Sequence, residues 1–213
     1  MGRIFLLAAL AMPVGGCSLF SFCGYLFAPE MKETTVDAEF DQLPGRRVAV
    51  VVFAQPGIDY AHPQARVSLS EAVAHDLKQN VKNITMIPAA TVRKFQRENL
   101  DWYALPRREL ARRLGVDYVL HLGLEEYSMA DPNSGMFRAR ITTDVNLYTA
   151  APAPDAVGGD TPVWTGRIRV VYPDDNDRAI VASDDRAARA DAHALYAKLL
   201  ARKFYQHKIK ADE

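Results

Sequence analysis

Cysteine is almost absent from this chain of 213 residues, since Cys17 and Cys23 are the only two and both stand near the N-terminus. No disulfide framework can therefore hold together the long region downstream of them. Net charge is absent as well, because 26 lysines and arginines balance 26 aspartates and glutamates. A balance of this kind does not indicate a polyanionic partner, and we expect no binding of nucleic acid.

Familiar catalytic motifs are missing too. The sequence contains no G-x-G-x-x-G, P-loop, G-x-S-x-G, H-E-x-x-H or C-x-x-C, which argues against common nucleotide, hydrolase, zinc and redox sites. The acidic run at 174–177 would need glycine at Ala179 to form an EF-hand loop. We therefore expect no catalytic residue, no metal and no cofactor, and we interpret the chain as a non-enzymatic protein.

The N-terminal segment, residues 1–16, has the layout of a secretion signal. Arg3 supplies a positive charge, and residues 4–14 (IFLLAALAMPV) form an uncharged, mostly apolar stretch. The sequence VGGC that ends at Cys17 resembles the lipobox of bacterial lipoproteins, in which small residues precede a cysteine that is acylated and becomes the new N-terminus. The resemblance implies a membrane anchor on Cys17. The residue after the cysteine is Ser18 and not an aspartate, which resembles the pattern in lipoproteins sent to the outer membrane.

An uncleaved transmembrane anchor is the alternative interpretation of the same segment. Residues 4–29 carry no charge and are numerous enough to span a bilayer. Against this, Pro13, Gly15 and Gly16 would interrupt the helix near its middle. Both interpretations place the rest of the chain at a membrane surface, and we expect it to face the periplasm of a bacterial envelope.

The remainder is long enough for one domain with a sizeable core. Residues 17–45 are expected to be the lipidated tether and linker, since they end in a charged, turn-prone stretch. Residues 46–206 form the predicted domain, and residues 207–213 a polar tail.

The first half of this domain alternates predicted strands and helices. Strands are expected at 47–54 (RVAVVVFA) and 84–87, where apolar residues run together. Helices are expected at 89–98 and from Pro106 to Gly115. Another helix is predicted to begin at a capping box, Ser68 to Glu71, and to bury one apolar stripe: Leu69, Val73, Leu77 and Val81.

The second half changes to a period of two. Alternating apolar residues predict strands at 116–125, 138–147 and 164–172. A final helix is predicted with four core positions: Ala188, Ala192, Leu195 and Leu199. The order β-α-β-α-α-β-β-β-α predicts an α/β fold with a mixed sheet, parallel in its first part and built from antiparallel hairpins at its end.

Four segments carry a resemblance to a known kind of domain: the VAVVVF strand, the helix at Ser68, LGVDYVL at 114–120 with Gly123 after it, and VWTG at 163–166. Over residues 46–205 the chain resembles the small α/β domain of several envelope proteins. These include the curli-secretion channel lipoprotein, lipoprotein activators of peptidoglycan synthases, an exopolysaccharide-export lipoprotein and the N-terminal domain of the Tol-system propeller protein. The resemblance implies a role in binding or assembly, although the channel-forming insertions of that family are not evident.

One polar cluster follows from the predicted pairing of the strands at 116–125 and 138–147. Keeping the apolar faces together places Leu124 opposite Ile141 and, on the other face, Glu125 opposite Arg140. Six polar side chains then share that face: His121, Glu125, Arg140, Asp144, Arg167 and Arg169.

The same pairing places His121 opposite Asp144. Because a carboxylate can orient a histidine, the face could form a ligand-binding or acid/base site. Ordinary cross-strand charge pairing is the simpler interpretation, since no nucleophile or metal set accompanies the two residues. A second charged feature is a basic helical face that is either solvated or suited to an anionic partner: Arg107, Arg108, Arg112 and Arg113.

These observations favour a lipoprotein that binds or helps to assemble another envelope component, in export, cell-wall or outer-membrane maintenance. A periplasmic module that binds a small molecule or glycan on the polar sheet face is the first alternative, and a hydrolase with an unrecognised site is the second. Inner or outer membrane, oligomeric state and the identity of the partner stay open from the sequence.

Overall fold

The computed structural model describes residues 33–151, 160–174 and 185–210. The expected signal peptide, Cys17 and most of the acidic run at 174–177 lie outside the described residues. The described chain divides into two units, one spanning 35–207 and the other combining 33–34 with 208–210. Among the described residues, no helix is both long enough and apolar enough to cross a membrane.

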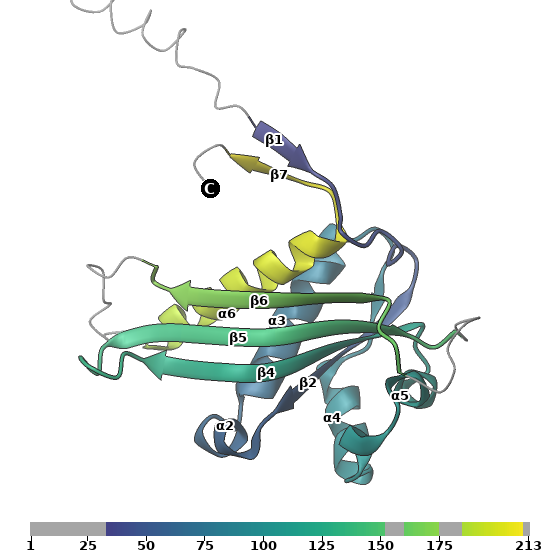
Figure 1. Ribbon diagram of the computed structural model, residues 1–213, viewed down its shortest axis with the longest axis horizontal. Helices are drawn as coiled ribbons and strands as arrows, with labels where there is room; N and C mark the ends of the chain where they lie inside the picture. Colours follow the sequence, from purple (N-terminus) through teal and green to yellow (C-terminus); the bar gives the residue numbers. More distant parts are fainter. Residues whose placement is uncertain (1–32, 152–159, 175–184, 211–213) are drawn as a thin grey trace, which may run out of the picture. The chain divides into compact units, whose positions relative to one another are not determined.

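A five-stranded mixed sheet forms the centre of the larger unit (Figure 1), in the order β3-β2-β4-β5-β6. The strands are β2 (Arg47–Ala54), β3 (Thr85–Met86), β4 (Tyr118–Ala130), β5 (Phe137–Thr149) and β6 (Trp164–Tyr172). β2 runs parallel to both β3 and β4, whereas β4, β5 and β6 are antiparallel neighbours. This arrangement confirms the predicted α/β fold, parallel first and antiparallel at the end.

Helices cover the sheet unequally. They are α2 (Pro56–Ala61), α3 (Ala65–Asn80), α4 (Ala89–Glu98), α5 (Arg107–Leu114) and α6 (Asp185–Ala201), with short 3-10 helices η1 (Trp102–Ala104) and η3 (Arg202–Phe204). α3 and α6 lie side by side on one face (Figure 1) and enclose the main core. α4 and α5 enclose a smaller core on the other face, mainly over β2 and β4.

The main core contains the apolar stripe expected on α3, since Leu69, Val73 and Leu77 are all fully buried. Each such side chain contributes roughly 1.5–3 kcal/mol by leaving water. α6 differs in detail, because Tyr196 and Leu200 are fully buried while Leu195 and Leu199 are half-buried at the margin of the core. The final helix is therefore rotated slightly from the predicted core positions.

The predicted capping box at Ser68 is wrong. α3 begins at Ala65, and the backbone N–H of Ser68 already donates a 2.9 Å hydrogen bond to the carbonyl of Gln64. Burial of Ala65 in the main core accounts for the earlier start, because the additional turn covers apolar surface. The end of α5 agrees with expectation, since Gly115 has a φ of 65° and closes the helix in the left-handed conformation.

Structure also forms in the segments expected to be linker and tail. Leu43 is fully buried in the main core, and the carbonyl of Lys203 accepts hydrogen bonds from the backbone N–H groups of Glu39 and Phe40, at 2.8 and 3.2 Å. Strands β1 (Glu33–Val36) and β7 (His207–Lys210) pair in a separate two-stranded sheet. These segments are mostly polar, so their few apolar anchors produced no recognisable period.

Candidate functional site

The register of β4 and β5 differs from the predicted one by two residues. Leu124 lies opposite Thr143, and Gly123 rather than His121 lies opposite Asp144. His121 instead lies opposite Asn146. The expected dyad of His121 and Asp144 is therefore wrong. A shift of two residues leaves every side chain on its own face, so the alternation of the sequence could not distinguish the two registers.

A β-bulge lies in β4 directly after Leu124. The pairing shifts between Leu124 and Glu126, which takes Glu125 out of the ladder and places Arg140 opposite Ser128. Glu125 and Arg140 are thus not cross-strand partners, contrary to the prediction. Arg140 instead forms an ion pair with Asp131, at 3.1 Å.

Arg167 links the remaining charges of the polar sheet face. Its Nη1 lies 3.2 Å from Oδ1 of Asp144, and its Nη2 donates to Oε2 of Glu125. Arg169, on the same strand, lies opposite Thr142 and is exposed. Because the acids and bases of this face largely neutralise one another at exposed positions, each pair is worth about 1 kcal/mol or less. Among the described residues, the arrangement is cross-strand charge pairing.

His121 lies apart from these ion pairs. Its ring packs near Tyr148, with centroids 6.5 Å apart, and its Nε2 is buried without a hydrogen-bond partner among the described residues. Burial, together with the smaller effect of the nearby charge of Arg107, lowers the pKa of His121 to about 4. The imidazole is consequently neutral at pH 7, and no carboxylate of the described residues orients it.

The basic face of α5 is balanced only in part by the acid of the same helix, Glu109. Glu109 accepts a 3.0 Å hydrogen bond from Arg113 and lies 3.8 Å from Arg112. Arg107 donates from its guanidinium to the backbone carbonyls of Tyr103 and Leu105. These contacts favour the solvated interpretation of that face.

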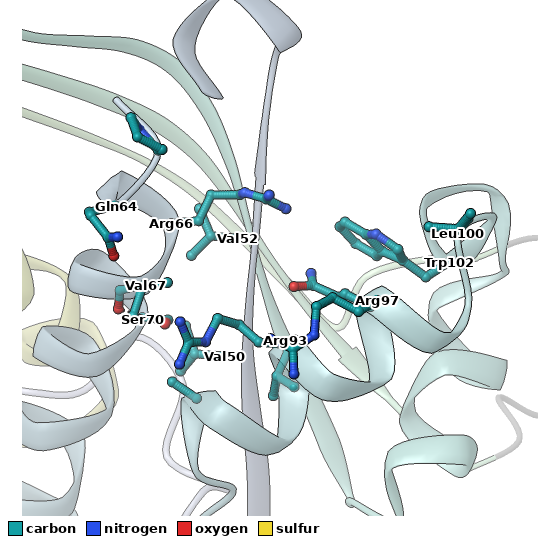
Figure 2. Close-up of a pocket in the computed structure, with 14 residues that line it drawn as sticks. Val50, Val52, Gln64, Arg66, Val67, Ser70, Arg93, Arg97, Leu100 and Trp102 are labelled. Carbon is teal, nitrogen blue, oxygen red and sulfur yellow. Dashed lines mark hydrogen bonds between the residues drawn. The ribbon is translucent and has the colours of Figure 1, made fainter. Parts of the chain in front are cut away.

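A feature that the sequence analysis did not single out is a cavity of about 380 Å³ between α3 and α4, beside β2 (Figure 2). Its volume falls within the usual range for ligand pockets. The lining residues come from these elements and the loops near them: Val50, Val52, Pro63, Gln64, Arg66, Val67, Ser70, Ala89, Val92, Arg93, Gln96, Arg97, Leu100 and Trp102.

Two arginines of α4 give this cavity its charge. Arg93 and Arg97 stand one turn apart, and no described residue forms an ion pair or hydrogen bond with either guanidinium. Figure 2 shows Arg93 reaching from α4 toward α3. Arg66 differs, because Asp59 accepts two hydrogen bonds from it at 2.7 and 2.9 Å. The cavity thus carries two positive charges that the described residues do not balance.

The other lining groups supply a donor and apolar surface. Nε2 of Gln96 is buried and has no hydrogen-bond partner among the described residues. Trp102 is buried in the smaller core, whereas Leu100 at the rim of the cavity is 81% exposed. Such a site suits an anionic group attached to an apolar one. The described residues contain no group of three or more His, Cys, Asp or Glu side chains that could hold a metal ion.

The sequence contains one signal for this site, the spacing of Arg93 and Arg97 at i and i+4. The acid nearest to them on the helix, Glu98, lies 3.8 Å from Lys94 instead. The remaining lining residues are separated widely in sequence, so no local pattern connects them.

Comparisons with known proteins identify no family. No family model matches the chain, and no curated protein matches its sequence. Among solved structures, the chain is similar to the PelC dodecamer from Paraburkholderia phytofirmans at 13% identity, covering 82% of this chain and 98% of that one with a TM-score of 0.46. It is also similar to lipoprotein GNA1162 from Neisseria meningitidis at 16% identity, covering 60% and 80% of the two chains, with a TM-score of 0.40.

A third similar structure is protein XCC0632 from Xanthomonas campestris, at 15% identity, with 76% and 82% of the chains covered and a TM-score of 0.45. At these identities and TM-scores the similarity carries no conclusion about ligands or role. One of these three structures, GNA1162, is named as a lipoprotein. The resemblance to the curli, peptidoglycan-synthase and Tol proteins stays a prediction.

Proposed function

We propose that this chain is an envelope lipoprotein, anchored in the outer membrane through Cys17, whose domain faces the periplasm and binds an anionic group of another envelope component. It acts by binding and not by catalysis. The observation that carries the proposal is the cavity between α3 and α4, where Arg93 and Arg97 have no acidic partner among the described residues.

The physical argument concerns these two charges. Like charges one turn apart on a helix destabilise it by a few tenths of a kcal/mol, on the order of 0.2–0.5 kcal/mol. An anion held between Arg93 and Arg97 removes that repulsion and forms charge-assisted hydrogen bonds, which are stronger than neutral ones. The indole of Trp102 offers apolar contact.

Calorimetric titration of the full-length protein in detergent micelles tests the binding. The probes are phosphate, citrate and polyglutamate, each added separately. We expect saturable binding of at least one probe, weakened up to about fivefold by Arg93→Gln or Arg97→Gln, because each change removes one charged contact at an exposed position, worth about 1 kcal/mol or less. Arg169→Gln is the matched control, since this exposed arginine lies on the polar sheet face.

The outcomes separate the two surfaces. Binding that is weakened by Arg169→Gln and not by the changes on α4 would move the site to the sheet face. No saturable binding of any probe would overturn the proposal for the cavity.

Mass spectrometry of the protein from membranes tests the anchor. The expected mature chain begins at an acylated Cys17 and lacks residues 1–16. An intact Met1, or an unmodified Cys17 in the membrane-bound form, would overturn the lipoprotein assignment.

A further inference from the structure

The side of β2 that faces away from β4 is only partly covered. β3 pairs with β2 at Arg47 and Val48 alone, and no other described strand lies on that side. Beyond Val48, the β2 backbone therefore has an edge without a neighbouring strand.

The hydrogen bonds show which residues face this edge. The carbonyl of Val48 accepts from Ile87 on the β3 side, at 2.9 Å, whereas the carbonyl of Arg47 accepts from Asp117 on the β4 side, also at 2.9 Å. Because successive residues of a strand direct their backbone groups to opposite sides, Val50 and Val52 direct their N–H and C=O groups to the free edge. No described residue pairs with those groups.

This edge borders the cavity. Val50 and Val52 both line it, and they lie between α3 and α4 in Figure 2. α3 packs on one face of the sheet and α4 on the other. The strand edge thus forms the floor of the cavity, and the two helices form its walls.

We propose that this cavity accepts an extended, acidic peptide segment of a partner protein as an added strand beside Val50 and Val52. The inference rests on the proposed function and names the class of partner. Main-chain hydrogen bonds to a free edge are a recurrent way to recognise extended peptides, with side-chain pockets supplying the specificity.

Charge determines which segment fits. A glutamate or aspartate directed toward α4 would meet Arg93 and Arg97. Since alternate residues of a strand point to opposite faces, the neighbours of that acid would point toward α3, where Val67 lines the cavity. The preferred segment is therefore an acidic residue between two apolar ones.

The backbone edge is what separates a peptide from a free anion. A phosphate or citrate ion could contact the arginines, but it would leave the backbone groups of Val50 and Val52 without protein partners. A peptide strand satisfies both sets of groups, and its rise of roughly 3.3 Å per residue matches that of β2.

The test uses a capped probe peptide, acetyl-Thr-Val-Glu-Val-Thr-amide, titrated calorimetrically into the full-length protein in detergent micelles. Two analogues of this peptide each carry one N-methyl group. In the first analogue the group is on the backbone nitrogen of Glu, and in the second it is on the backbone nitrogen of the Val that follows. Because only alternate N–H groups of an added strand face β2, we expect one analogue to bind about tenfold or more weakly and the other to bind like the parent.

A second comparison tests the charge. Replacement of the peptide glutamate by glutamine should weaken binding to the unaltered protein about tenfold, and this difference should vanish in the Arg93→Gln/Arg97→Gln variant. It should persist in the Arg169→Gln control. Hydrogen exchange at the Val50 and Val52 amides should slow in the complex, while the Val51 amide, which faces β4, should be unchanged.

The failures can be told apart. If both N-methylated analogues bind like the parent while citrate or polyglutamate binding depends on Arg93 and Arg97, the cavity is an anion site and the strand inference is overturned while the proposed function stands. If peptide and anions alike bind without dependence on these arginines, both are overturned.

Discussion

The hydroxyl of Tyr127 on β4 lies 2.8 Å from Nε2 of His193 on α6, and both side chains are buried between the sheet and that helix. The ring of His62 packs against Tyr127 with centroids 4.9 Å apart. Burial, aided by the charge of Arg189, lowers the pKa of His193 to about 4, and burial raises the pKa of Tyr127 to about 12. Two neutral side chains therefore connect α6 to β4 at neutral pH.

Stability should fall as the pH decreases from about 6.5 to about 4. In the unfolded chain His193 takes up a proton at its ordinary pKa, whereas in the folded chain its pKa is about 4. Between these two pKa values the unfolded chain binds more protons, so acid favours unfolding across this window. At about 1.4 kcal/mol per pKa unit, the loss from His193 approaches about 3 kcal/mol. Urea denaturation at pH 7 and at pH 4.5 measures the difference.

His193→Gln should reduce this pH dependence without removing it, because burial also lowers the pKa of His121 to about 4. An unaltered pH dependence in the His193 variant would show that this side chain does not carry the effect.

A second buried hydrogen bond, 2.7 Å between Thr143 Oγ1 and the hydroxyl of Tyr196, should contribute to stability. Tyr196→Phe and Thr143→Val each leave one polar atom buried without its partner, which costs roughly 1–3 kcal/mol. The double variant should lose less than the sum of the two, because it leaves neither atom unpaired. Tyr103→Phe, at an exposed position, is the control, and additive losses in chemical denaturation would argue against the bond.

Gly115→Ala should destabilise the protein by about 1–2 kcal/mol, because its positive φ is costly for a residue with a Cβ atom. Space is not the cause, since a Cβ there would meet nothing within 4 Å. Gly57→Ala in α2 is the matched control, with equally open space and no positive φ. Thermal denaturation of both variants measures the effect, and equal stability of the two would contradict this interpretation.

Arg167→Gln should cost about 1 kcal/mol or less, although it breaks the ion pairs with both Asp144 and Glu125. The pairs are exposed, so water and salt screen them. Chemical denaturation at low salt and in 1 M sodium chloride should show a small difference that disappears at the higher concentration. A loss of several kcal/mol would indicate that these charges are more than surface pairing.

The sequence predicted the elements whose residues repeat with a clear period. The alternation along residues 138–147 identified β5, and the stripe from Leu69 to Leu77 identified the buried side of α3. The helix end at Gly115 followed from one residue, because the left-handed conformation favours glycine. Such signals are local, so they can be recognised without knowledge of the tertiary contacts.

Part of the polar sheet face could also be predicted. Arg167 does lie beside Asp144 and Glu125, because alternation alone assigns each residue to a face. The pairing of His121 with Asp144 could not be predicted, since the inner faces match equally well in registers two residues apart. The bulge at Glu125 leaves no distinctive mark in the sequence either.

By itself, then, the sequence determined the order of the elements other than β1, α2 and β7, the mixed sheet and the face on which each strand residue lies, because these depend on periods within single segments. Only the tertiary structure decided the register, the two short strands β1 and β7, and the cavity. That cavity unites Val50, Val67, Arg93 and Trp102, which approach one another because α3 and α4 pack on opposite faces of a sheet whose edge strand β3 is short.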